Sequence, residues 1–247
     1  QRISIRLPIG TEEVIKNASR ERFVEFYESW YTANRMAVVV VGDINAAEIE
    51  TVIRKHFDSM DAREKRADPD MGNLANRDFD VHYHYEDEAG ETSVSIEALK
   101  TRRSPPDNSA RRLDDLQRMM AARIMNRRLE RLTKAENSPI SSATMHAGDF
   151  FDLGFALYSS IDADCKPEDW KEALTLIEQE LRRALEHGFT ESELNETKAV
   201  IGRLYEDAAK QMGTRKSRDL ANEIASRIGS RRIFTSPAED LQRVMRS

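Results

Sequence analysis

The chain has 247 residues, of which 33% are charged, with a net charge of −6. No stretch approaches the roughly 18 apolar residues that a membrane-spanning helix needs, and the acidic balance argues against nucleic-acid binding. The one cysteine, Cys165, cannot form an internal disulfide. These properties predict a polar globular protein with one large domain or two small ones.

The first periodic segment follows a turn at Pro8 and Gly10. Ser19 is a predicted N-cap, and the aromatic residues after it recur at helical spacing, which predicts one buried helix face: Phe23, Phe26, Tyr27, Trp30 and Tyr31. Residues 37–44, AVVVVGDI, are rich in β-branched side chains and predict a buried strand. A second helix begins at Asn45, so we expect a helix–strand–helix unit here.

Residues 61–78 lack apolar periodicity, carry many charges and are predicted to be a linker. Two alternating segments follow, at 79–87 and 92–101, and they predict two strands joined by a turn around Gly90. A long helix is expected over residues 109–134, and two further strands within 140–150 and 152–163.

Three helices are expected in the remainder. The first begins near Pro167 and ends at Gly188, the second has a capping box of Thr190 and Glu193, and the third covers about 216–228. Paired strands with segregated helices indicate an α+β fold, in which an antiparallel β-sheet is flanked by helices.

The most metal-like cluster lies in the alternating segment at 79–87. On a strand, His82, His84 and Glu86 share one face, and a His-x-His pair of this kind can hold zinc. The alternative is the solvated face of an amphipathic strand whose other face is Val81, Tyr83 and Tyr85. Because no third histidine or cysteine is in register, the sequence favours the solvated face.

Two other candidates are weaker. Cys165 and a histidine would make a nucleophilic pair, but nothing near Cys165 suggests an activated thiolate, so a structural cysteine is favoured. Three arginine pairs suggest phosphate or acidic-peptide binding, whereas the interleaved acids favour solvated helix surfaces: Arg111–Arg112, Arg127–Arg128 and Arg231–Arg232. The residues alone therefore show no catalytic constellation.

Two stretches resemble the insulinase/pitrilysin family of zinc metallopeptidases, the inverzincins. Residues 8–58 have the family's PIG turn, a helix ending in Tyr and Trp residues, an Asn-containing break and a VVGD strand before another amphipathic helix. Residues 187–201, HGFTESELNETKAVI, are similar to a helix start in the family's following domain. Since the family is built from tandem domains of one fold, the resemblance implies the C-terminal part of a catalytic-type domain at 1–60, a linker at 61–78, and a second, non-catalytic domain at 79–247 that is truncated at its C-terminus.

The family's zinc motif, H-x-x-E-H, is absent. None of the five histidines begins it, and in family members the motif and the third zinc ligand precede the PIG turn. The resemblance therefore implies zinc in a longer parent protein, bound upstream of this chain, with no catalytic or metal-binding residue here. We expect this chain alone to be inactive.

The resemblance implies that the parent is a zinc metalloendopeptidase that degrades or processes peptides or proteins, and that this segment is a non-catalytic part of a peptide chamber. The alternative is a segment of a non-peptidase family member, acting as an assembly or peptide-binding subunit. The expected partners are peptide or protein substrates and the remaining domains of the parent, with no nucleic acid and no membrane span. Similarity to bacterial zinc proteases favours the periplasm.

Family members that anchor peptides away from the zinc use an extended strand and the following helix of the second domain. The matching positions here are Ser93, Val94, Ser95 and Ile96, followed by Met125, Asn126 and Arg127. This chain has ARIMNRR where the family has small residues, so bulky side chains would fill the groove. The alternative is an ordinary edge strand and an ordinary packed helix.

Overall fold

The structure, a computed structural model of the chain, describes residues 10–64, 66–70, 72, 74, 79–102, 106–150 and 155–246. The chain forms two compact units. Unit 1 comprises Gln1–Gly72 and Thr214–Phe234, and unit 2 comprises Asn73–Gly213 and Thr235–Ser247. The first boundary falls inside the predicted linker, and the segment Thr214–Phe234 belongs to unit 1 although it comes late in the sequence.

Unit 2 is built on a three-stranded antiparallel sheet in the order β1-β3-β2. The strands are β1 (Thr92–Thr101), β2 (Ile140–Asp149) and β3 (Ala156–Cys165). Thr92 faces Cys165 at one end of the β1–β3 pair, and Thr101 faces Ala156 at the other. All three segments were predicted as strands, so the α+β class is confirmed.

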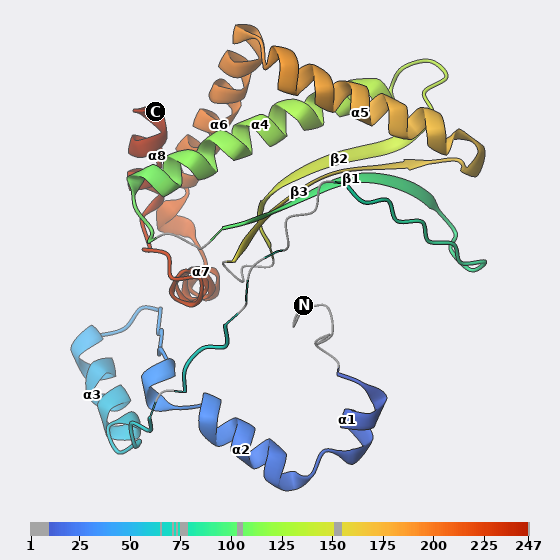
Figure 1. The fold of residues 1–247 in the computed structure, drawn as a ribbon. Helices are drawn as coiled ribbons and strands as arrows, with labels where there is room; N and C mark the ends of the chain where they lie inside the picture. The colour runs from blue at the N-terminus through green and yellow to red at the C-terminus, as the bar shows by residue number, and fades with distance from the viewer. Residues whose placement is uncertain are drawn as a thin grey trace. The chain divides into compact units, whose positions relative to one another are not determined.

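Two long helices cover one face of this sheet (Figure 1). Helix α4 (Ser109–Thr133) packs on β2, and α5 (Trp170–His187) packs on β1 and β3. Their apolar faces meet the sheet in one core: Met125, Leu129, Ile140, Ile161, Ala163, Ala173 and Ile177. Gly188 ends α5 with φ +67°, a conformation that glycine adopts without strain.

Two capped helices complete unit 2. Helix α6 (Glu191–Lys210) has the predicted capping box: the Thr190 hydroxyl accepts from the Glu193 backbone N–H, and the Glu193 side chain accepts from the Thr190 N–H. Helix α8 (Pro237–Met245) has the same device at Ser236 and Glu239, and it packs on α6. Each box satisfies backbone N–H groups that a helix start leaves unpaired.

Unit 1 contains four α-helices among its described residues: α1 (Glu12–Asn17), α2 (Arg20–Trp30), α3 (Ala46–Phe57) and α7 (Ser217–Gly229). Where the sequence predicts a free linker, part of the chain is bound to this unit. Asn34 donates a hydrogen bond to the Arg63 carbonyl at 2.8 Å, and Asp68 pairs with Arg35 at 2.9 Å and with Arg231 at 3.1 Å. We call residues 61–70 the strap.

Two predicted strands are not strands in the structure. Residues 37–44 form no ladder, and Val38 and Val40 are 46% and 47% exposed. Residues 79–87 also form no ladder, and the side chains of Phe79 and Tyr83 are almost fully exposed. A strand needs a partner edge to pair its backbone groups, and among the described residues neither segment pairs with one.

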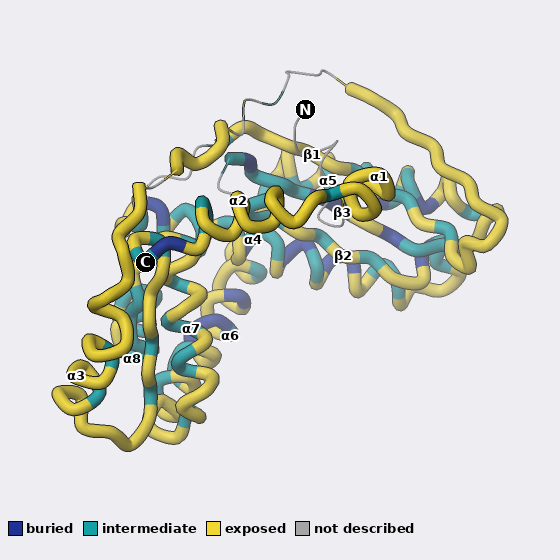
Figure 2. Tube along the Cα trace, turned by 90° about the horizontal axis from the view of Figure 1, so that it is seen from below, coloured by how far each residue is buried: buried dark blue, intermediate teal, exposed yellow. Residues whose placement is uncertain are grey.

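The predicted buried face of α2 is likewise exposed. The exposed fractions of Phe23, Phe26 and Tyr27 lie between 57% and 65%. Figure 2 shows the contrast: α1, α2 and α3 are coloured as exposed along most of their length, whereas buried segments recur along the sheet and its helices. The helical period was correct, but in the described chain only Trp30 of this face is partly covered, by Arg35 and Arg66. None of the helices in the described ranges is long and apolar enough to cross a bilayer.

Candidate peptide-binding edge

Strand β1 has one side of its backbone with no strand partner in the part of the chain that the structure describes. The Arg102 N–H donates to the Phe155 carbonyl at 2.8 Å, directly after the pair Thr101–Ala156. Because hydrogen-bonded pairs alternate along an antiparallel ladder, the even-numbered residues of β1 bond to β3, while Ser93, Ser95 and Glu97 turn their N–H and C=O groups outward. No strand in the described ranges pairs with this outer side.

The four predicted strand residues therefore divide into two pairs. Val94 and Ile96 pack against the core with their side chains and bond to β3 with their backbone. Ser93 and Ser95 have exposed side chains on the opposite face of the sheet and outward-facing backbone groups. Only Ser93 and Ser95 of this set are available to another chain.

The three predicted α4 residues have partners within unit 2. Met125 is 1% exposed and belongs to the core. The Asn126 side chain donates to the Met145 carbonyl at 2.9 Å and accepts from the Met145 N–H at 2.7 Å. Both polar atoms of its amide are therefore bonded to the backbone of β2. Arg127 is paired with Glu196 and is half exposed.

The structure does not bring the two predicted groups of residues together. β1 and β2 are the two outer strands, with β3 between them. Asn126 binds the backbone of β2, whereas Ser93 and Ser95 face outward from β1. A peptide lying along β1 would therefore contact the strand residues without contacting Asn126.

The His-x-His segment shows no metal geometry. His82 lies 3.4 Å from an Asp80 oxygen and His84 lies 3.6 Å from a Glu86 oxygen, and both histidine side chains are more than 80% exposed. Among the described residues no group of three or more His, Cys, Asp or Glu side chains is placed to hold an ion. The described histidines and carboxylates are therefore not arranged as a zinc site.

Cys165 and the arginine pairs have structural surroundings. Burial raises the pKa of the Cys165 thiol, and Asp169 and Asp164 raise it further, so the thiol stays neutral and a poor nucleophile. Arg111 is buried and pairs with Asp149 at 3.3 Å. Arg112 and Arg128 also make largely buried ion pairs, whereas Arg127 and Arg231 are exposed, so the solvated surface that the sequence favoured is found for only some of the arginines.

A buried clamp around Arg128 was not predicted. Its guanidinium donates to Glu193 at 2.6 and 2.7 Å, to Glu180 at 3.2 Å and to the Gly188 carbonyl at 3.2 Å. The clamp joins α4, α5 and α6 at the turn where α5 ends. The sequence singled out Arg128 only as half of the Arg127–Arg128 pair on the predicted helix.

The comparisons with known proteins agree on the family. A family model described as "Peptidase M16 inactive domain" matches residues 17–201. The probable zinc protease PqqL of Escherichia coli (strain K12) is 23% identical over 238 residues, which cover 96% of this chain and 25% of that protein. The probable zinc protease PqqL of Haemophilus influenzae is also 23% identical, over 244 residues and 25% of its length.

The fold comparison gives the same result. The crystal structure of the periplasmic protease PqqL from Escherichia coli superimposes with a TM-score of 0.86 at 21% identity, covering 98% of this chain and 26% of that one. The chain spans about a quarter of the length of the relatives it matches. Solved structures of insulinase-family proteases share its fold. The chain belongs to the M16 inactive-domain family, within the insulinase-type zinc proteases.

Proposed function

We propose that this chain is the non-catalytic, peptide-guiding part of a zinc metalloendopeptidase. The observation that supports the proposal is the match of three quarters of the chain to an inactive peptidase domain, combined with a sheet edge whose backbone groups face outward. The curated relatives are named as zinc proteases, and PqqL is described as periplasmic. We therefore place the parent protein in the periplasm, with peptides or proteins as substrates.

The hydrolytic chemistry belongs outside this chain. Activation of water by zinc needs the ion, an open coordination position and a nearby base. The described histidines and carboxylates do not fit such a site. We propose that residues outside the described part of this chain bind the zinc of the parent, and we assign no reaction step to the described residues.

The proposed contribution of this chain is binding by strand addition. An extended peptide laid along β1 exchanges hydrogen bonds with the outward groups of Ser93, Ser95 and Glu97. Each such bond contributes about 0.5–1.5 kcal/mol net. Because the backbone makes these contacts, their contribution to affinity depends on the length of the peptide more than on its sequence.

A proline substitution in the full-length enzyme tests this contact. Ser95→Pro removes an N–H that faces outward and leaves the bonds to β3 intact, and proline is tolerated at such edge positions. We expect KM for long peptides to rise by about 5-fold, which corresponds to about 1 kcal/mol, while kcat and KM for short peptides stay unchanged. Ser95→Ala is the matched control, because it keeps the N–H and removes only the hydroxyl.

Equal effects of Ser95→Pro on long and short peptides, or none on either, would contradict binding at this edge. The competing occupant is the alternating segment 79–85, which is joined to β1 by a turn with an Ala89 N–H to Glu86 carbonyl bond of 3.0 Å. If that segment pairs with β1, Ser95→Pro lowers stability and leaves KM unchanged. Asn126→Ala with Arg127→Ala tests the α4 prediction separately, by the same comparison of long and short peptides.

A further inference from the structure

The sheet of unit 2 has one face that α4 and α5 do not cover (Figure 1). Val94 and Ala143 pack against the core that includes Ile161. Since side chains alternate along a strand, the residues between these point to the opposite side. We call that side the open face: the odd-numbered residues 93–99 of β1 and the even-numbered residues 142–148 of β2 and 158–164 of β3. Most of them are exposed.

The charges of the open face are almost all negative. Glu97 lies on β1, and Asp162 and Asp164 lie on the neighbouring strand β3. The one lysine of the three strands, Lys100, is an even-numbered residue of β1 and points to the other side. His146 on β2 is the one basic side chain of the open face. The open face therefore presents three carboxylates and no lysine or arginine.

Small side chains leave the two aspartates accessible. The residues that face them across the sheet have hydroxyl groups: Ser93, Ser95, Ser142 and Thr144. The Ser160 hydroxyl donates to Asp162 at 2.7 Å, and the Ser142 hydroxyl donates to Asp164 at 2.5 Å. Within the described ranges neither aspartate forms an ion pair, so each carboxylate is oriented by one hydroxyl and can still bind a cation.

The carboxylates act on a neighbouring group of the same face. Burial raises the pKa of the Tyr158 hydroxyl, and the charges of Glu97 and Asp162 act in the same direction. Tyr158 faces Leu99 across the β1–β3 pair. The negative potential of the open face therefore extends along β3 from Asp164 to Tyr158.

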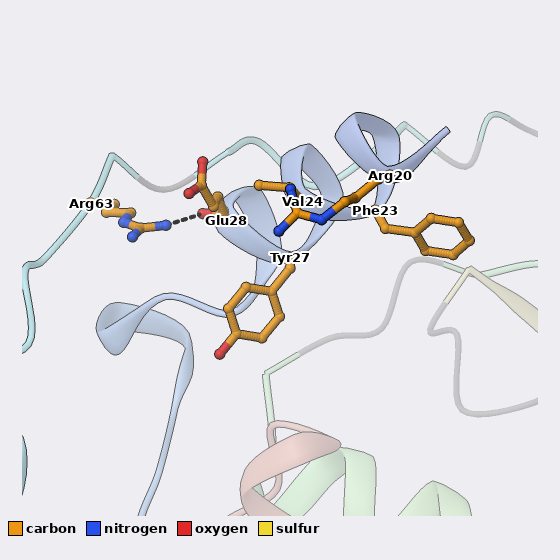
Figure 3. Close-up of a pocket in the computed structure, with 6 residues that line it drawn as sticks. All are labelled: Arg20, Phe23, Val24, Tyr27, Glu28 and Arg63. Atoms are coloured by element: carbon orange, nitrogen blue, oxygen red, sulfur yellow. Dashed lines mark hydrogen bonds between the residues drawn. The ribbon is translucent and has the colours of Figure 1, made fainter. Parts of the chain in front are cut away.

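A hollow in unit 1 has the opposite balance of charge. It has a volume of about 650 Å³ and is lined by Arg20, Phe23, Val24, Tyr27, Glu28 and Arg63. Figure 3 shows the rings of Phe23 and Tyr27 projecting from α2, with Arg63 bonded to the Glu28 carbonyl. Two arginines and one glutamate do not attract a basic partner. Of these two surfaces, the open face is the one that complements positive charge.

We propose that the open face binds the lysine and arginine side chains of peptide substrates, and so makes the parent enzyme prefer basic peptides. This inference rests on the proposed function, in which a peptide lies along β1. Backbone bonds at that edge do not distinguish sequences, whereas alternate side chains of the peptide lie on the same side as Ser93 and Ser95. A long basic side chain there extends past the small serines towards Asp162 and Asp164.

Binding of matched peptides to the full-length protein tests the inference. Fluorescence anisotropy gives Kd for two labelled peptides of about 20 residues that differ at four positions, all lysine or all glutamine, with a chelator present so that neither is cleaved. At about 0.01 M salt we expect the lysine peptide to bind at least 10-fold more tightly. At about 1 M salt, where the Debye length falls to about 3 Å, the preference should fall below about 2-fold. Equal Kd values at low salt would overturn the inference.

Substitutions in the full-length protein locate the preference. Asp162→Asn with Asp164→Asn removes two charges and keeps an acceptor for each serine hydroxyl. We expect the preference for lysine to fall from at least 10-fold to about 2-fold. Glu97→Gln, at an exposed position, should reduce it less. The urea midpoint of each variant shows that it is folded.

Glu186→Gln is the matched control, because Glu186 is an exposed carboxylate of α5, which packs on the other face of the sheet. This variant lowers the net charge equally for each residue changed and should keep the full preference. If the double variant and Glu97→Gln both keep the full preference, or if Glu186→Gln loses as much of it as Glu97→Gln does, the open face is not the binding surface and the inference is wrong.

Peptide cleavage without the chelator is measured separately. A full-length protein that prefers the lysine peptide through Asp162 and Asp164, but cleaves neither peptide, would support the inference and contradict the proposed function. A peptidase that binds and cleaves both peptides equally well would support the proposed function and contradict the inference.

Discussion

Two adjacent arginines on α4 have opposite surroundings. The Arg128 side chain is 10% exposed and is clamped by Glu193 and Glu180, whereas the Arg127 side chain is 50% exposed and pairs with Glu196 alone. The Phe189 ring lies 5.1 Å from the Arg128 guanidinium. Because burial removes water as an alternative partner, loss of one member of the buried set leaves the others unsatisfied.

We expect Arg128→Met to lower the free energy of unfolding by about 3–5 kcal/mol, since the buried Glu180 and the partly buried Glu193 lose the guanidinium that they share. Arg127→Met is the matched control and should cost about 0–1 kcal/mol, as exposed pairs do. Urea unfolding of the 247-residue chain followed by circular dichroism measures both. Similar losses in the two variants would contradict the clamp.

The clamp also makes stability depend on pH. Hydrogen bonds from Arg128 hold the pKa of Glu193 at about 2, well below its usual 4.5, and Thr190 contributes to the lowering. Since the unfolded chain binds the proton more tightly, the stabilisation is present above pH 4.5 and is lost as the pH falls towards 2. The shift corresponds to about 3 kcal/mol. We expect Glu193→Gln to flatten this part of the stability curve, measured by urea unfolding between about pH 2 and pH 6.

At the scale of elements, the sequence predicted the features that depend on residues close together in the chain. The strand at 92–101 has its predicted bounds, and the capping box at Thr190 and Glu193 is present. The segments 37–44 and 79–87 had equally good strand patterns, yet neither pairs. Pairing depends on a neighbouring edge, which a single segment's sequence does not contain.

The strap has contacts that the sequence of the predicted linker does not indicate. The sequence predicts residues 60–78 to be the internal stretch most sensitive to protease, but Asp68 joins Arg35 to Arg231 and the strap lies on unit 1. Arg35 in turn lies 4.6 Å from the Trp30 ring. We expect Asp68→Asn to speed trypsin cleavage after Arg63 and Arg66 several-fold, because local opening becomes easier.

Asp70→Asn is the control for the strap, since Asp70 accepts a bond from the Gly72 N–H within the same loop. The rate is measured by mass spectrometry of timed digests. If both variants are cut as slowly as the wild type, the strap does not depend on Asp68. If the wild type is itself cut at once at Arg63 and Arg66, residues 61–70 behave as the free linker that the sequence predicts.

At the scale of the whole molecule, the sequence predicted the family and the α+β class because its motifs are local and contiguous, such as residues 8–43 and 187–201. The structure brings only some of the predicted site residues to one place. Ser93 and Ser95 lie on an open edge, but Asn126 bonds to Met145 of another strand. Which backbone an amide side chain meets depends on helix-to-sheet packing, and a resemblance between motifs does not specify that packing.

The central claim is that this chain is a non-catalytic part of a zinc peptidase. Zinc content and peptidase activity, measured side by side on the full-length protein and on the 247-residue chain after mild dialysis, test it most directly. We expect one zinc ion per full-length polypeptide and cleavage of a fluorogenic peptide, with neither property in the isolated chain. Stoichiometric zinc in the isolated chain that is lost on replacing His82 and His84 by alanine, or a full-length protein with neither zinc nor activity, would contradict the claim.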